Sequence, residues 1–137
     1  MRSAILPLSA ALLVMSLTPA LASAQTLVGR ADSVYTWRGT IPANGMFVIR
    51  NFNGPIDVRP SNGSTAELRA EKRTRGGDVR DVGFEVQTAS NGDVTICSAH
   101  AENDSCDGDR NRRDNGWRRE VTVAMTVLVP RGVQLKV

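Results

Sequence analysis

Apolar and polar residues alternate with a period of two along most of this chain, and no sustained helical stripe follows residue 24. Because successive side chains of a strand point to opposite faces, the alternation predicts strands that each turn one face toward a core. The sequence therefore predicts an all-β domain of antiparallel strands. The predicted strands are Met46–Arg50, Ile56–Arg59, Thr65–Lys72, Val82–Gln87, Val94–Cys97, Glu120–Val129 and Val133–Val137.

Asn-Gly pairs separate several of these strands, among them Asn53-Gly54, Asn62-Gly63 and Asn91-Gly92. Both residue types tolerate positive φ, so each pair predicts a tight turn. Residues 51–55 are expected to return the chain from strand 46–50 to strand 56–59. Residues 98–117 have no apolar period and predict a long polar surface loop.

The first 24 residues carry the three parts of a secretory signal peptide. Met1-Arg2 is positive, residues 4–17 are apolar, and Ala22-Ser23-Ala24 places small residues before a cut between Ala24 and Gln25. Ala20-Leu21-Ala22 offers a second cleavage register two residues earlier. The apolar run is shorter than the roughly 20 residues that span a bilayer, so no stable membrane insertion is expected after cleavage.

We therefore expect a helical signal peptide over residues 1–24 and one domain over residues 25–137. After cleavage the domain holds 16 basic and 14 acidic residues, a net charge of +2. That balance disfavours a nucleic-acid binder, which must neutralise many phosphates. The exported protein is expected in the periplasm, on the cell surface or secreted, and neither its partner nor its oligomeric state follows from composition.

Cys97 and Cys106 are the two cysteines of the chain. In an exported protein a disulfide between them is the default expectation, and the ten-residue loop corresponds to roughly 2.5–3 kcal/mol of stabilisation. The alternative is a metal pair, but structural zinc sites need four ligands and His100 is the one histidine. No metal site and no cofactor are predicted.

The polar loop carries two candidate binding chemistries. Asp107, Asp109 and Asn111 match the first EF-hand positions, but Arg112 and Arg118 stand where glycine and glutamate are needed, which argues against calcium. Arginines beside Trp117 favour a polyanion, although interleaved acidic residues cancel much of their field. The candidate anion-binding residues are Arg110, Arg112, Arg113, Arg118 and Arg119.

No catalytic residues are predicted. His100 lies in a polar stretch with Ser98 and Ser105 nearby in sequence, but no nucleophile-elbow motif supports them. The aromatic residues Tyr35, Trp37, Phe47 and Phe84 are expected to pack in or at the rim of the core.

The order of these motifs resembles the front end of bacterial adhesin-like proteins built on a β-strand-repeat domain of unknown function. The matching motifs are Trp37-Arg38-Gly39, Gly45–Asn51, Phe52–Val58, Leu68–Arg73, Val94–Cys97, Val121–Val129 and Pro130–Val133. The resemblance implies a sandwich-like module that leads into stacked repeats of a β-solenoid, without catalytic residues. Those repeats do not follow Val133–Val137 here, so the chain is expected to be truncated at its C-terminal end.

Two functions therefore remain open. The first is a non-enzymatic, exported β-strand module of an adhesin-like envelope or secreted protein. The second is an envelope sensor that recognises an anionic molecule through the arginine-rich loop 110–119.

Overall fold

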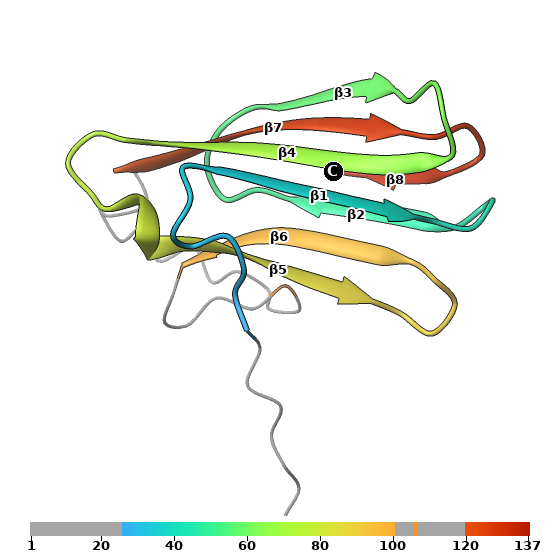
Figure 1. The fold of residues 1–137 in the computed structure, drawn as a ribbon, viewed down its shortest axis with the longest axis horizontal. Helices are drawn as coiled ribbons and strands as arrows, with labels where there is room; N and C mark the ends of the chain where they lie inside the picture. The colour runs from blue at the N-terminus through green and yellow to red at the C-terminus, as the bar shows by residue number, and fades with distance from the viewer. Residues whose placement is uncertain (1–25, 101–105, 107–119) are drawn as a thin grey trace, which may run out of the picture.

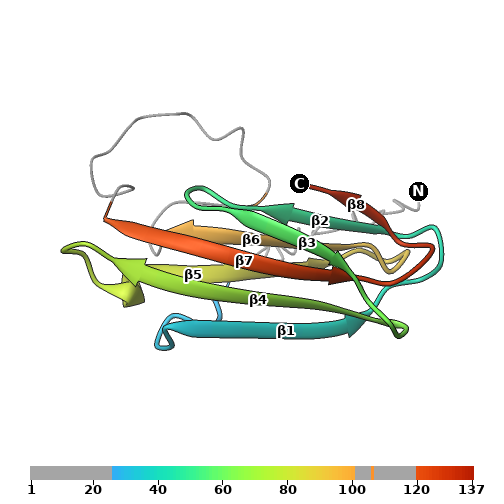
Figure 2. The same ribbon diagram turned by 90° about the horizontal axis from the view of Figure 1, so that it is seen from above.

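Two four-stranded β-sheets face each other and share one core (Figures 1 and 2). The computed structural model describes residues 26–100, 106 and 120–137. Its strands are β1 (Val34–Thr40), β2 (Met46–Arg50), β3 (Ile56–Pro60), β4 (Thr65–Thr74), β5 (Val82–Thr88), β6 (Val94–His100), β7 (Val121–Val129) and β8 (Gln134–Lys136), and a single 3-10 turn, η1 (Val79–Asp81), precedes β5.

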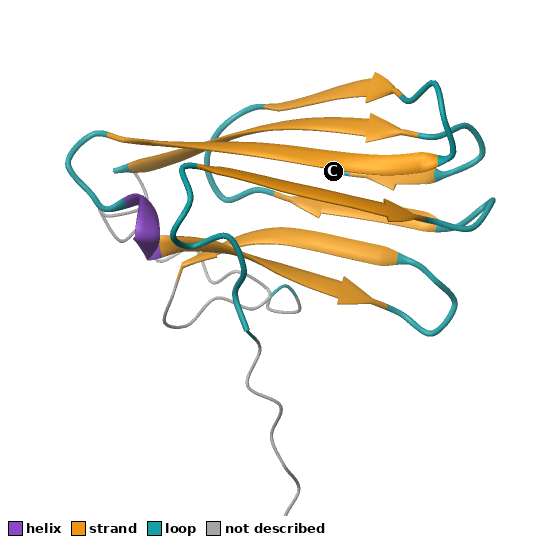
Figure 3. Ribbon diagram, viewed as in Figure 1, coloured by secondary structure: helices purple, strands orange, loops and turns teal. Residues whose placement is uncertain are grey.

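The all-β class is confirmed for the described residues, which include no α-helix (Figure 3). No helix within these ranges is long and apolar enough to cross a membrane. The predicted signal peptide and its cleavage site between Ala24 and Gln25 lie outside the described residues.

Strand pairing is mixed, which corrects the expectation of an antiparallel domain. One sheet has the order β1-β4-β7-β3 and the other β5-β6-β2-β8. The pairs β1–β4, β4–β7 and β5–β6 are antiparallel. The pairs β3–β7, β2–β6 and β2–β8 are parallel, and in each pair the strands are joined by a long connection, which parallel pairing requires.

The core follows from the alternation. Ala66, Leu68 and Ala70 of β4 are buried, as are alternate residues of β7 from Val121 to Val127. Across the core, Tyr35 stacks on Phe84 with ring centroids 4.6 Å apart, and Trp37 lies 5.4 Å from Phe47. The predicted packing role of these aromatics is confirmed.

The prediction that residues 51–55 fold back into a hairpin is wrong. These residues cross from one sheet to the other, so that β2 and β3 lie in different layers. The Asn51 amide donates to the carbonyl oxygens of Val123 (2.7 Å) and Gly54 (3.2 Å) and thereby fastens the corner to β7. Gly54 has φ 121°, and a Cβ there would overlap the Val123 carbonyl, which explains glycine at this position.

The Asn91-Gly92 turn does form a hairpin, between β5 and β6. Gly92 N–H donates to the Ala89 carbonyl at 2.9 Å, which closes the turn. Strand β1 was not predicted, because its inward residues Tyr35, Trp37 and Gly39 are only half-buried and do not form an aliphatic pattern. Its pairing with β4 determines its place.

Candidate functional site

The predicted disulfide between Cys97 and Cys106 is confirmed. Cys97 lies in β6, where its neighbours in sequence, Ile96 and Ser98, point toward the core. By alternation, Cys97 lies on the outer face of its sheet. The disulfide therefore anchors Cys106 to that outer face, and both cysteines are buried.

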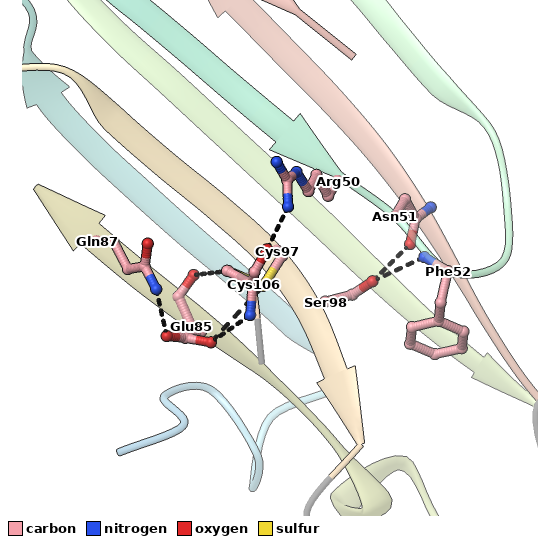
Figure 4. Close-up of a disulfide and its surroundings, with 8 residues drawn as sticks. All are labelled: Arg50, Asn51, Phe52, Glu85, Gln87, Cys97, Ser98 and Cys106. Atoms are coloured by element: carbon pink, nitrogen blue, oxygen red, sulfur yellow. Dashed lines mark hydrogen bonds between the residues drawn. A yellow bond between two sulfur atoms is a disulfide. The ribbon is translucent and has the colours of Figure 1, made fainter. Parts of the chain in front are cut away.

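Two charged side chains hold Cys106 from either side (Figure 4). Glu85 on β5 and Arg50 on β2 are the register partners of Cys97 on the two neighbouring strands. The Glu85 carboxylate accepts from Cys106 N–H at 2.8 Å, and the Arg50 guanidinium donates to the Cys106 carbonyl. The other Glu85 oxygen accepts from the Gln87 amide at 2.7 Å.

Glu85 is 3% exposed, which is unusual for a carboxylate and requires hydrogen-bond partners. The Glu85 oxygen and the two cysteine sulfurs lie within 4.8 Å of one another, as metal ligands would. However, the sulfurs are bonded to each other, and thiolates are the form of cysteine that binds metal. The arrangement thus serves as an anchor for Cys106.

A second polar cluster lies beside this anchor, where β2 ends. The buried Ser98 hydroxyl donates to the Asn51 side-chain oxygen at 2.9 Å and accepts from Phe52 N–H at 3.1 Å. Figure 4 shows these three residues together at the start of the corner. The hydroxyl donates one bond and accepts another to position residues 51–52, so Ser98 contributes to the corner.

The covered side of the sandwich is formed by the edges of β1 and β5 together with residues 27–33. Val28 exchanges two 2.9 Å backbone hydrogen bonds with Phe84 of β5, and Ser33 accepts from Lys72 N–H at 2.8 Å. Residues 27–33 therefore lie across the gap between the two edges.

Lys72 joins several segments of this covered side through hydrogen bonds. Its ammonium nitrogen lies 2.8–3.0 Å from four backbone carbonyl oxygens, and the residue is 4% exposed. Burial lowers the pKa of Lys72 from its usual value, because the charged form loses hydration. The four oxygens belong to Gly29, Arg30, Val79 and Val82.

The open side of the sandwich is formed by the edges of β3 and β8, along which the described residues place no further strand. Val58 of β3 pairs with the fully buried Val127 and yet is 43% exposed. Leu135 of β8 and Ile56 of β3 are also only partly buried. Unpaired N–H and C=O groups and inward-facing apolar side chains thus remain accessible along these two edges.

The predicted anion-binding arginines lie outside the described residues, so anion binding by loop 110–119 stays a prediction. Two residues of structural importance, Lys72 and Glu85, were not predicted from the sequence. Lys72 continues the inward series of Ala66, Leu68 and Ala70, and that parity was a usable signal. Glu85 gave none, because its burial depends on Cys106 packing against it from 21 residues away.

Comparisons with family models, with curated proteins and with solved structures found no match to this chain.

Proposed function

We propose that this protein is an exported, non-enzymatic β-strand module that begins a β-solenoid and caps its first coil. The assembled solenoid presents a surface for adhesion or another envelope-level interaction. The observation that carries the proposal is the parallel pairing along the open side.

The chain passes repeatedly from one sheet to the other, and each coil of a solenoid would repeat such a passage. Strand β2 passes through residues 51–55 into β3 in the other sheet, and β7 passes through residues 130–133 into β8. Strand β8 is parallel to β2, and β3 is parallel to β7. A segment that turned after β8 around the same end as residues 51–55 would run parallel to β3 along its free edge.

The covered side has the properties of a solenoid cap. Caps must protect the terminal strands from pairing with other chains. Here Val28 pairs with Phe84 and protects part of the β5 edge, and Ser33 extends the β1–β4 pairing by one residue. The β3 and β8 edges have no such pairing among the described residues.

Two features support export and a non-enzymatic role. A disulfide persists in oxidising compartments, which agrees with the predicted signal peptide. The buried polar side chains Glu85, Ser98 and Lys72 each bond to backbone groups that they position. N-terminal sequencing of the processed protein should begin at Gln25; retention of Met1 in a cytoplasmic fraction would contradict export.

The open side can be tested on the processed chain, residues 25–137, by sedimentation velocity over a range of concentrations. Without a following coil, the free edges should cause concentration-dependent association. Val58→Lys places a charge among the inward side chains of β3 and should abolish it. Val34→Lys is the matched control, because Val34 is 39% exposed on the β1 edge of the covered side.

A monomer at every concentration, or equal loss of association in both variants, would contradict a free strand-accepting side. The reading frame beyond the Val137 codon provides an independent test. It should encode short apolar segments separated by glycine turns. A stop codon directly after Val137 would remove the solenoid from the proposal.

A further inference from the structure

A hollow of about 640 Å³ lies at the end of the sandwich where the β1–β2, β3–β4 and β7–β8 connections meet. These connections are at the right-hand end in Figure 1. The volume falls in the range of roughly 300–1,000 Å³ that is typical of small-molecule sites. Side chains from all three connections line it, including Thr40, Asn62 and Arg131.

Backbone contacts between the connections hold the hollow in shape. Asn44 N–H donates to the Gly132 carbonyl at 2.7 Å, which joins the first connection to the third. Ser61 N–H donates to the Val129 carbonyl at 2.8 Å, which joins the second to β7. Pro60 and Pro130 line the walls with fixed φ angles, so little conformational entropy is lost when a ligand binds.

The charge of Arg131 is not neutralised. No aspartate or glutamate is among the described residues that line the hollow. Seven other arginines in the described ranges either donate a hydrogen bond to a backbone carbonyl or pair with a carboxylate: Arg30, Arg38, Arg50, Arg59, Arg69, Arg73 and Arg80. Arg131 and Arg75 are the two described arginines without such a partner. Arg75 lies directly after β4, at the opposite end of the sandwich. A guanidinium in this state is suited to bidentate recognition of a carboxylate.

The other lining groups suit a polyhydroxylated ligand. The Thr40 and Ser64 hydroxyls and the Asn62 amide have no hydrogen-bond partner within the part of the chain that the structure describes, so they are available to sugar hydroxyls. Ile41, Pro130 and Val133 supply apolar surface for the C–H faces of a sugar ring. One guanidinium matches the single charge of a carboxylate better than a phosphate dianion.

From this arrangement we propose that the hollow is a binding site for a saccharide that carries a carboxylate, such as a uronic acid. Arg131 binds the carboxylate, and Asn62 with Ser64 binds ring hydroxyls. The site lies at the end of the sandwich, where Pro60 of the edge strand β3 borders it, and its ligand binding does not depend on the proposed solenoid.

The test uses the processed chain labelled with ¹⁵N, digalacturonate as the probe and the neutral dimethyl ester of digalacturonate for comparison. Digalacturonate at millimolar concentration should shift the amide signals of the non-proline residues within 40–45, 61–65 and 131–133. Arg131→Gln should weaken the binding of digalacturonate about tenfold or more, as expected for a charge-assisted hydrogen-bonding contact. The same variant should leave the binding of the ester unchanged. Asn62→Ala should weaken both probes.

Arg75→Gln is the matched control and should not change binding. Absence of shifts in the three connections would overturn the site. Equal binding of the ester would overturn the assignment of a carboxylate, and equal weakening by Arg75→Gln would reduce the interaction to nonspecific charge. The amide spectra themselves report whether each variant is folded.

Discussion

The two sides of this sandwich differ in how their edge strands are covered. Each side ends in two edge strands, β1 with β5 and β3 with β8. On the covered side, residues 27–33 pair with Phe84 and the buried Lys72 binds their carbonyls. On the open side, the inward-facing Val58 stays 43% exposed. The comparison teaches that residues 27–33 pack against one side and pair with part of its β5 edge, whereas the β3 and β8 edges have no such pairing among the described residues.

The lysines of the chain show the same difference. Lys72 lies on the covered side, 4% exposed and surrounded by carbonyl oxygens, whereas Lys136 lies on β8 and is exposed. A buried ammonium costs hydration and is stable here because every proton finds an acceptor. The covered side is therefore the region where single substitutions should matter most.

Lys72→Met should cause the largest effect. The change leaves four backbone carbonyls without their shared donor, so the free energy of unfolding should fall by roughly 3–4 kcal/mol. Urea denaturation monitored by Trp fluorescence measures it. Lys136→Met is the matched control and should stay within about 0.5 kcal/mol of the parent. Similar losses in both variants would show that the covered side has no special role.

Cys97→Ala with Cys106→Ala should have the next largest effect. Loss of the ten-residue covalent loop should lower the free energy of unfolding by roughly 2.5–3 kcal/mol. Glu85 and Arg50 still have their bonds to the Cys106 backbone, so Glu85→Gln in the double variant should add a further loss. If Glu85→Gln has no effect in either background, the anchor depends on the disulfide alone.

Asp93→Asn tests how the first residue of β2 is held in place. Strand β2 pairs with β8, one of the two edge strands of the open side. The Asp93 carboxylate accepts from Met46 N–H at 2.8 Å, and this bond lowers the pKa of Asp93 below its usual value. Because the folded-state pKa is lowered, the stabilisation is present above the unfolded-state pKa and is lost as pH falls through the folded-state value. Parent and variant should therefore differ in melting temperature at pH 7 and converge in acid. A difference that persists in acid would exclude ionisation as its cause.

Val58→Thr should have the smallest effect on stability. Its side chain is already 43% exposed on the open side, so the free energy of unfolding should change by at most about 0.5 kcal/mol. Ala66→Thr gives the contrast, because Ala66 is fully buried on β4 and a larger polar side chain there should cost roughly 1–3 kcal/mol. Chemical denaturation of both variants measures the difference. A large loss for Val58→Thr would mean that β3 is packed against more of the protein than the open side suggests.

Much of the fold could be predicted from local pattern. The bounds of β2 match the prediction, β7 differs by one residue, and β4 and β6 extend two and three residues beyond it. The disulfide also follows from cysteine count and the predicted export. The candidate sites could not be predicted in the same way. Lys72 needs residues 29–30 and 79–82 around it, and the hollow at Arg131 needs three connections that are distant in sequence.

By itself, the sequence determined seven of the eight strands, all but β1, and their buried faces, because the side-chain period of two is a local property of the backbone. Only the tertiary structure decided which strands are neighbours and in which direction they run. Asn51 and Asn53 bond to β7, which comes about 70 residues later, and this contact sends β3 into the other sheet rather than back along β2. Pairing depends on hydrogen bonds between distant segments, and a local pattern carries no information about them.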